Sequence, residues 1–146
     1  MSVVSKDVVL PAPPERVFAA LVEPAQRAAW VRTLLEAPRA ESLRQGDRVD
    51  ATRRGSTSGS RYVLTVTRLD APRVLATDVA RNGQHVGRNT FELTPTPDGT
   101  RVRATAEIQL SGLQRMMTSM VVAAAEKELV AELDALRAHV ANEGKR

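Results

Sequence analysis

An alternating segment near the end of the chain, followed directly by a long helical segment, constrains the fold more than any other feature. The even-numbered residues from Val102 to Leu110 are apolar, and the odd-numbered residues from Arg101 to Gln109 are polar. This period of two predicts a strand with one buried and one wet face. A helical segment then runs from Ser111 to about Asn142. Since an apolar sheet face must be covered, we expect a curved antiparallel sheet packed on this helix.

The earlier part of the chain supplies the rest of the sheet and two short helices. Pro13 and Pro14 with an early Glu15 favour a helix start, Pro24 favours a second one, and Asn82-Gly83 favours a hairpin. The expected elements are a strand at 2–10, helices at about 14–23 and 24–31, an irregular or edge strand within 34–43, and strands at 48–54, 61–69, 74–81, 86–94 and 101–110, with a flexible loop at 55–60. The sequence therefore predicts a single α+β domain over residues 1–146, with about six to seven strands.

The apolar residues of the C-terminal helix fall into two stripes that do not share one face. Leu113, Met116, Met117 and Met120 form the first, and the second runs from Val122 through Leu129 to Val140. At about 100° per residue, Met120 and Leu129 lie roughly 180° apart. We expect either a kink near residues 121–125 or a separate contact for the first turns.

The composition excludes several classes of function. The chain has 146 residues, no Cys, two His and a net charge of +4, and its basic residues are spread singly apart from the pairs Arg53-Arg54 and Lys145-Arg146. Thiol chemistry is therefore excluded, no block of positive charge favours nucleic acid, and no apolar run approaches the ~18 residues of a membrane span. We expect a cytoplasmic protein that does not bind nucleic acid.

No catalytic motif can be assembled from the spacing of the polar residues. Ser and His never occur in a nucleophile-and-base arrangement, and the Gly55–Gly59 segment lacks the Lys and the strand-to-helix context of a phosphate loop. Whether the protein is an enzyme is left open by the sequence.

Several short segments, in the same order along the chain, resemble a known superfamily. They are Ala12–Phe18, Trp30, Gly46, Leu69–Leu75, Phe91–Pro95 and Asp98–Val102. On these residues the chain is similar to the START-like (SRPBCC) superfamily with the helix-grip fold, and most similar to its bacterial polyketide cyclase/dehydrase-type members.

The resemblance implies a cavity between the sheet and the long helix that holds a lipid, polyketide or other largely apolar small molecule. It does not imply one reaction, because the superfamily includes carriers, cyclases, hydroxylase domains and co-chaperones. Hydroxylase chemistry is set aside here, since neither a Rieske pattern nor an iron triad can be assembled, and we expect no cofactor or metal.

Candidate cavity walls come from the apolar and aromatic residues. They are Trp30, Tyr62, Leu64, Phe91, Met116, Met117 and Met120. The methionines suit an adaptable wall, because the resemblance places the start of the last helix across the pocket mouth; packing beneath a loop is the alternative. Trp30 can equally be core, and the opposite face of the 61–69 strand, with Val63 and Thr65, can claim the wall instead of Tyr62 and Leu64.

Three polar residues are candidates for orienting a ligand. Asn89 shares the inward parity of Phe91, His85 lies near the start of the same strand, and Arg53 shares the parity of Ala51. Asn89 can bind a carbonyl or hydroxyl, His85 can act as an acid or base, and Arg53 can pair with an anion or enolate.

Each of these residues has a structural alternative: a bulge for Asn89, a solvated turn for His85 and a snorkelling surface arginine for Arg53. Asp78 is expected to be solvated. We expect Glu126, Lys127, Glu128 and Glu132 to form an exposed helix surface with pairing between residues four apart.

Three functions follow from the sequence. The first is binding of a largely apolar small molecule, and the second is a polyketide cyclase or dehydratase reaction in the same pocket. The third is a co-chaperone-like interaction module, which a closed and filled sheet-helix interface would favour. The protein is expected to be a monomer or a homodimer.

Overall fold

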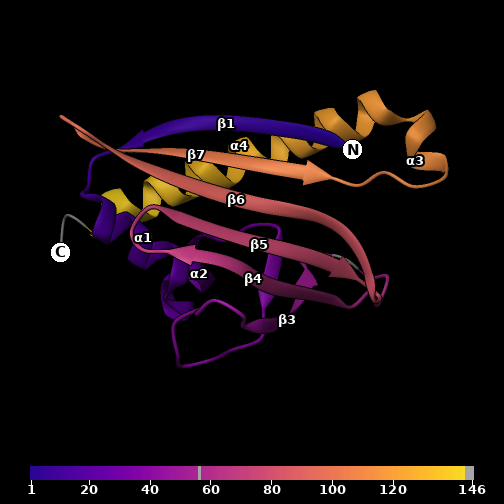
Figure 1. The fold of residues 1–146 in the computed structure, drawn as a ribbon, viewed down its shortest axis with the longest axis horizontal. Coiled ribbons are helices and arrows are strands. Elements are labelled where there is room, and N and C mark those ends of the chain that lie inside the picture. The colour runs from indigo at the N-terminus through magenta and orange to yellow at the C-terminus, as the bar shows by residue number, and fades with distance from the viewer. Residues whose placement is uncertain (56, 144–146) are drawn as a thin grey trace.

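The computed structural model describes residues 1–55 and 57–143 and contains a seven-stranded antiparallel sheet with helices on one side (Figure 1). The elements are β1 (Ser2–Leu10), α1 (Pro14–Val22), α2 (Pro24–Trp30), β2 (Leu34–Glu36), β3 (Arg48–Arg53), β4 (Tyr62–Asp70), β5 (Val74–Arg81), β6 (Gln84–Thr96), β7 (Gly99–Ile108), α3 (Leu113–Met116) and α4 (Thr118–Glu143). The strand order is β1-β7-β6-β5-β4-β3-β2, so the first strand joins the last and the other neighbours follow the chain. The predicted α+β helix-grip fold is confirmed.

Proline and glycine set the ends of the elements as the sequence predicts. Pro14 opens α1 with Glu15 in its first turn, and Glu23 is extended before Pro24, which opens α2. Asn82 and Gly83 both have positive φ, as a two-residue hairpin turn requires. In the 34–43 region only the three residues of β2 form a strand, and Ser56 of the predicted 55–60 loop lies outside the described residues.

The core lies between the concave face of the sheet, α1, α2 and the C-terminal half of α4. Its fully buried members include Leu10, Val17, Leu21, Val102 and Leu136. Register settles which faces of β4 and β5 point inward. They are the faces that carry Tyr62, Leu64 and Val66 on β4 and Leu75, Thr77 and Val79 on β5.

The long helix α4 is buried unevenly along its length. Leu133, Leu136 and Val140 are its buried residues, and all three lie in its second half. The first half lies along β1, where the Lys6 Nζ is 2.6 Å from Glu126 Oε1. This leaves space between the sheet and the first half of the helix.

Of the two alternatives for the C-terminal helix, a kink at residues 121–125 is not observed, because α4 is continuous through them. The helical segment is interrupted at Met117, between α3 and α4, where φ is −116° and ψ is 28°. Leu113 and Met116 lie on α3, which extends past the end of the sheet (Figure 1), whereas Met120 lies in the first turn of α4.

Candidate functional site

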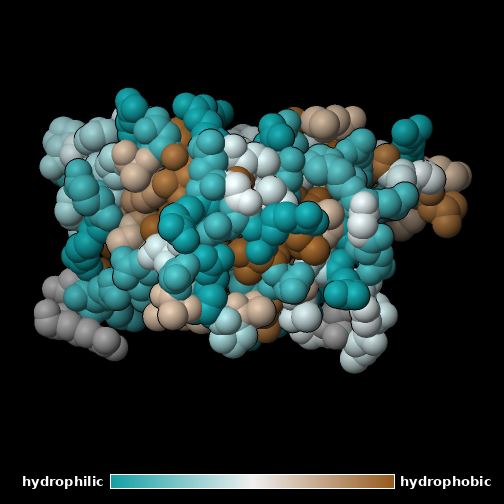
Figure 2. Space-filling model, turned by 60° about the horizontal axis from the view of Figure 1, so that its bottom comes forward, coloured by the Kyte–Doolittle hydropathy of each residue, from teal (hydrophilic) through white to brown (hydrophobic). Residues whose placement is uncertain are grey.

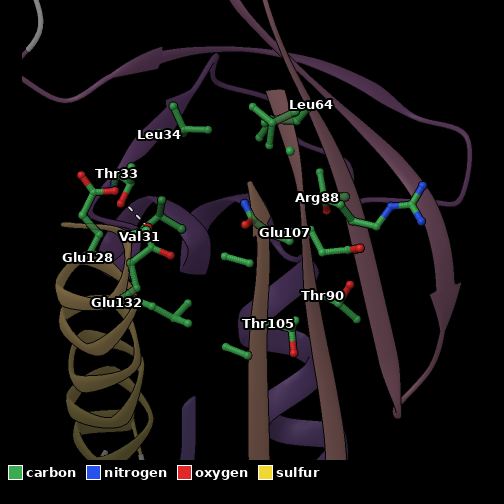
Figure 3. A pocket seen from close by; sticks show the side chains of 18 of the residues that line it. Val31, Thr33, Leu34, Leu64, Arg88, Thr90, Thr105, Glu107, Glu128 and Glu132 are labelled. Carbon is green, nitrogen blue, oxygen red and sulfur yellow. Dashed lines mark hydrogen bonds between the residues drawn. The ribbon is translucent and has the colours of Figure 1, made fainter. Parts of the chain in front are cut away.

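A cavity of about 210 Å³ lies between the sheet and the first half of α4 (Figure 3). Its walls come from β3 to β7, α2 and α4, and most of its lining is apolar. The apolar lining residues include Trp30, Val31, Leu34, Leu64, Val79, Val86, Phe91, Ala104, Ala106, Ile108 and Leu129. The interface between sheet and helix is thus hollow, which does not favour the interaction module.

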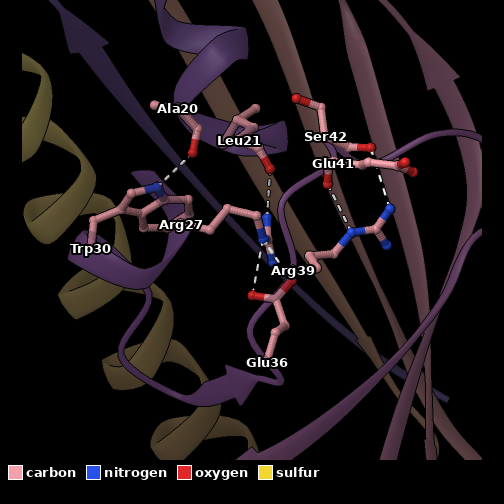
Figure 4. A network of polar contacts seen from close by, with 8 residues as sticks. All are labelled: Ala20, Leu21, Arg27, Trp30, Glu36, Arg39, Glu41 and Ser42. Atoms are coloured by element: carbon pink, nitrogen blue, oxygen red, sulfur yellow. Dashed lines mark hydrogen bonds and ion pairs between the residues drawn. The ribbon is translucent and has the colours of Figure 1, made fainter. Parts of the chain in front are cut away.

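Two aromatic rings form part of the cavity wall. The Trp30 and Phe91 ring centroids are 6.2 Å apart with an interplanar angle of 89°, an edge-to-face pair. The Trp30 indole donates from Nε1 to Ala20 O at 2.7 Å (Figure 4). The contact with Phe91 and the hydrogen bond to Ala20 together hold the indole ring in place, so this part of the wall is rigid.

Three polar side chains on the inner face of the sheet have no hydrogen-bond partner among the described residues. They are Tyr62, Thr77 and Asn89, and all three line the cavity. Thr77 and Asn89 are direct register partners on β5 and β6, so their side chains stand side by side. An amide and two hydroxyls in an apolar cavity can donate to, or accept from, a bound molecule.

A largely buried ion pair fastens α2 to the edge of the sheet. Arg27 Nε donates to Glu36 Oε1 at 2.7 Å and to Oε2 at 3.0 Å, and Arg27 Nη1 donates to Leu21 O at 2.7 Å (Figure 4). The side chains are 11% and 14% exposed. Because the Arg27 guanidinium already binds the Glu36 carboxylate and the Leu21 carbonyl, it has a structural role and is not a candidate for binding a ligand.

Two glutamates on α4 face the cavity from the helix side (Figure 3). Glu128 forms an ion pair with Arg53 of β3, and Glu132 Oε1 accepts from the Thr33 N–H at 3.1 Å. Glu126 and Glu128 are half-exposed and Lys127 is exposed, as expected, but the glutamates pair with Lys6, Arg53 and the Thr33 N–H and not within the helix. The reason is that the sheet curls far enough to bring β1, β3 and the 31–33 turn against α4.

The Arg53–Glu128 pair stands between the cavity and a wider vestibule. The vestibule has a volume of about 600 Å³, and the residues that it shares with the inner cavity are Arg53, Tyr62, Val86, Ile108, Ala125 and Glu128. Both charged side chains are 44% exposed. An ion pair at this exposure contributes only about 0.2–1 kcal/mol, so it opens readily.

The structure brings six of the ten predicted site residues to the cavity and leaves four outside it. Those that line it are Trp30, Arg53, Tyr62, Leu64, Asn89 and Phe91. The remaining four, His85 and the three methionines, lie elsewhere.

His85 is on the outer face of the sheet because of a bulge. Val79 pairs with Gly87 and Ala80 pairs with His85, so Val86 is the extra residue and the parity of β6 reverses there. Val86 therefore faces the cavity, while His85 Nδ1 lies 2.9 Å from Gln109 Oε1 on the outside.

The methionines are exposed because α3, the break at Met117 and the first turn of α4 all lie where the sheet does not cover them. Met116, Met117 and Met120 are 83%, 48% and 67% exposed, with Leu113 at 78%. Figure 2 shows hydrophobic residues at the end of the molecule where α3 lies in Figure 1. None of the four residues lines the cavity or the vestibule.

A charged cluster on the outer face explains why Asp78 is not simply solvated. Arg88 Nε donates to Asp78 Oδ1 at 2.6 Å, and Figure 3 shows Arg88 pointing away from α4. This hydrogen bond lowers the pKa of Asp78 from its ordinary value and raises that of Arg88. The cluster is separated from the cavity by the sheet.

Alternation alone does not identify every residue of this site. Thr77 is a member of the inward face of β5, and its pairing with Asn89 requires the register. Glu128 and Glu132 are four residues apart and so share one helix face, but their partners, Arg53 and the Thr33 N–H, come from other parts of the chain and have no signal in this spacing. Among the described residues, no group of three His, Asp or Glu side chains is arranged to hold a metal ion.

The curled sheet, the long helix and the cavity between them define a helix-grip, START-like protein. The model of the polyketide cyclase/dehydrase and lipid transport family matches residues 1–141, and the chain belongs to this family. No curated protein matches the sequence significantly. In the described part of the chain, no helix has the length and apolar character needed to cross a membrane.

Solved structures share the fold at low sequence identity. The protein MLL2253 of Mesorhizobium loti is 18% identical with a TM-score of 0.76, and the match covers 97% of this chain and 98% of that chain. CV1439 of Chromobacterium violaceum is 18% identical with a TM-score of 0.74, covering 96% and 98%. DynU16, from the dynemicin biosynthetic locus, is 15% identical with a TM-score of 0.73, covering 96% of this chain and 47% of that chain.

Proposed function

We propose that the protein binds a largely apolar small molecule, lipid-like or polyketide-like, in the cavity between the sheet and α4. The observation that carries the proposal is an apolar cavity of about 210 Å³ that opens to the surface and holds three unpartnered polar side chains. These three side chains are not among the buried polar atoms that lack a partner, so solvent reaches them in the open cavity and a bound molecule can take its place.

The arrangement of the lining supports a mode of binding. The apolar body of the ligand fills the space beside Trp30 and Phe91, and its oxygens reach Thr77 and Asn89. Two or three directed hydrogen bonds within an apolar envelope fix orientation, while the envelope supplies most of the affinity. The family description supports the same class of ligand.

Titration with Nile red, a neutral apolar dye, tests this proposal. Wild type should bind saturably and quench Trp30, which is the only tryptophan of the chain and lies in the wall. Ala106→Phe fills the cavity beside Asn89, its register partner, and should weaken binding by about tenfold or more.

Ala138→Phe is the matched control, since Ala138 is exposed on α4 and lines neither the cavity nor the vestibule. It should bind the dye like wild type. Equal binding by both variants, or no saturable binding by wild type, would refute the proposal. Native mass spectrometry of gently purified protein would then identify a co-purified ligand by its mass.

A polyketide cyclase or dehydratase reaction in the same cavity is the second candidate. The family description favours it, and so do the free Tyr62 hydroxyl and Asn89 amide, which can hold carbonyl oxygens of a folded chain and assist enolisation. Tyr62→Phe and Asn89→Leu should then abolish turnover of a poly-β-ketone thioester while circular dichroism is unchanged. His85→Ala, on the outer face, is the control that should keep activity.

A further inference from the structure

The boundary between the cavity and the vestibule carries a half-exposed charged pair. Arg53 lies at the end of β3, on the inner face and opposite Leu34, and its partner Glu128 lies across the opening on α4. From this we infer that Arg53 is the head-group receptor of the cavity, and that it binds the carboxylate of an amphipathic ligand in place of Glu128. The inference rests on the proposed function.

The pair differs from the other ion pair in the cavity wall in how firmly it is held. Arg27 has a second acceptor, the Leu21 carbonyl, and its side chain is 11% exposed. Within residues 1–55 and 57–143, Glu128 is the one hydrogen-bond and ion-pair partner of the Arg53 side chain, and both side chains are 44% exposed. Glu128 can therefore rotate into water when another carboxylate takes its place, whereas Glu36 cannot leave without stranding a buried cation.

The charges around the opening favour an anion at this depth. The vestibule is lined by Arg53, Arg81 and Glu128, which are its charged side chains among the described residues. Arg81 lies opposite Tyr62 in the register, and its Nε contacts Ser60 Oγ at 3.2 Å, so its charge has no acidic partner there. Once Glu128 turns away, two arginines face the vestibule.

The inner cavity, in contrast, disfavours an anion. Arg27 is neutralised by Glu36, and Glu132 adds a negative charge held by the Thr33 N–H. A carboxylate driven to the depth of Trp30 would meet this glutamate and lose its hydration without a cation to replace it. The ligand thus enters with its apolar tail first and leaves its carboxylate at Arg53.

A set of short-chain probes with the same tail and different heads tests this assignment. Octanoate, octanol and octylamine remain monomeric at useful concentrations, and their affinities can be measured by Trp30 fluorescence and calorimetry. Wild type should bind octanoate about tenfold tighter than octanol, and octylamine weakest.

Variants of the pair should change the head-group preference and leave the tail site intact. Arg53→Gln should bring octanoate down to the affinity of octanol, with octanol unchanged. Glu128→Gln removes the competing carboxylate and should tighten octanoate by about twofold to fivefold. Arg54→Gln is the control, because Arg54 is adjacent and exposed but lines neither the cavity nor the vestibule.

The outcomes separate the two proposals. Octanol binding as tight as octanoate, or equal effects of Arg53→Gln and Arg54→Gln, would overturn the assignment and leave the binding function standing. Tightest binding of octylamine would also overturn it, because Glu128 would then be the receptor. Failure of wild type to bind any of the three probes would refute the assignment and the proposed function together.

Discussion

Replacing Arg27 by methionine should destabilise the protein far more than replacing an exposed arginine. The variant removes two hydrogen bonds to Glu36 and one to the Leu21 carbonyl. It leaves the Glu36 carboxylate, 14% exposed, without its cation. Loss of one partner of a buried pair costs about 3–5 kcal/mol, and the residual exposure places this case near about 3 kcal/mol.

The melting temperature provides the simplest assay. For a chain of 146 residues, about 3 kcal/mol corresponds to a decrease of roughly 6–12 °C. Urea unfolding followed by circular dichroism gives the free energy directly and does not depend on Trp30, whose ring lies 6.0 Å from the Arg27 guanidinium.

The double variant Arg27→Met/Glu36→Met isolates the cause. It removes the stranded charge and leaves the Leu21 carbonyl as the unpaired group, so it should cost about 1–2 kcal/mol, less than Arg27→Met alone. Arg44→Met is the matched control, because Arg44 and Glu41 form a pair with both side chains 74% exposed. Its effect should stay within about 0.5 kcal/mol.

The reasoning is refuted if Arg27→Met unfolds within about 1 kcal/mol of wild type, since a stranded carboxylate cannot be that cheap. It is also refuted if the double variant is less stable than Arg27→Met. In that case packing of the side chains, and not the buried charge, would set the cost.

Three further predictions concern the core, the cavity wall and the outer face. Leu136→Ala should cost about 2–5 kcal/mol in urea unfolding, because Leu136 is a completely buried residue of α4. Gly87→Ala should cost about 1–3 kcal/mol and alter Nile red binding, since a Cβ there would lie 2.5 Å from the Glu107 carbonyl oxygen. Arg88 holds the pKa of Asp78 below its ordinary value, so the stabilisation is complete above about pH 4 and is lost as the pH falls through the lowered pKa. Arg88→Met should therefore lower the unfolding free energy at neutral pH and lose that difference in strong acid; a constant difference across pH would count against the pair.

The fold was predictable because its signals are local and agree with one another. Alternation in β7, the prolines that begin α1 and α2, and the Asn82-Gly83 turn each determine one element. Once the strands are antiparallel neighbours, the long helix has one apolar face to cover. The family resemblance supported the same order.

The site was less predictable because it depends on single-residue irregularities and on distant partners. The extra residue at Val86 reverses the parity of β6 without changing its composition, so alternation alone could not decide whether His85 reached the cavity or stayed in solvent. Glu128 looked like a solvated helix residue, and only the curl of the sheet brings Arg53 against it. The Met117 break likewise cannot be read from the two apolar stripes, since Met120 and Leu129 lie on opposite faces of one continuous helix.

Because α4 is buried unevenly, only its C-terminal half is anchored in the core. The anchoring residues are Leu133, Leu136 and Val140. The ion pairs of the N-terminal half, made by Glu126 and Glu128, are half-exposed. Amide exchange should accordingly be faster in residues 118–130 than in residues 131–143, and occupancy of the cavity should slow it. Because the first half of α4 is held loosely, it can move to fit ligands of different size. The volume of the cavity is therefore set by the bound ligand as well as by the sheet.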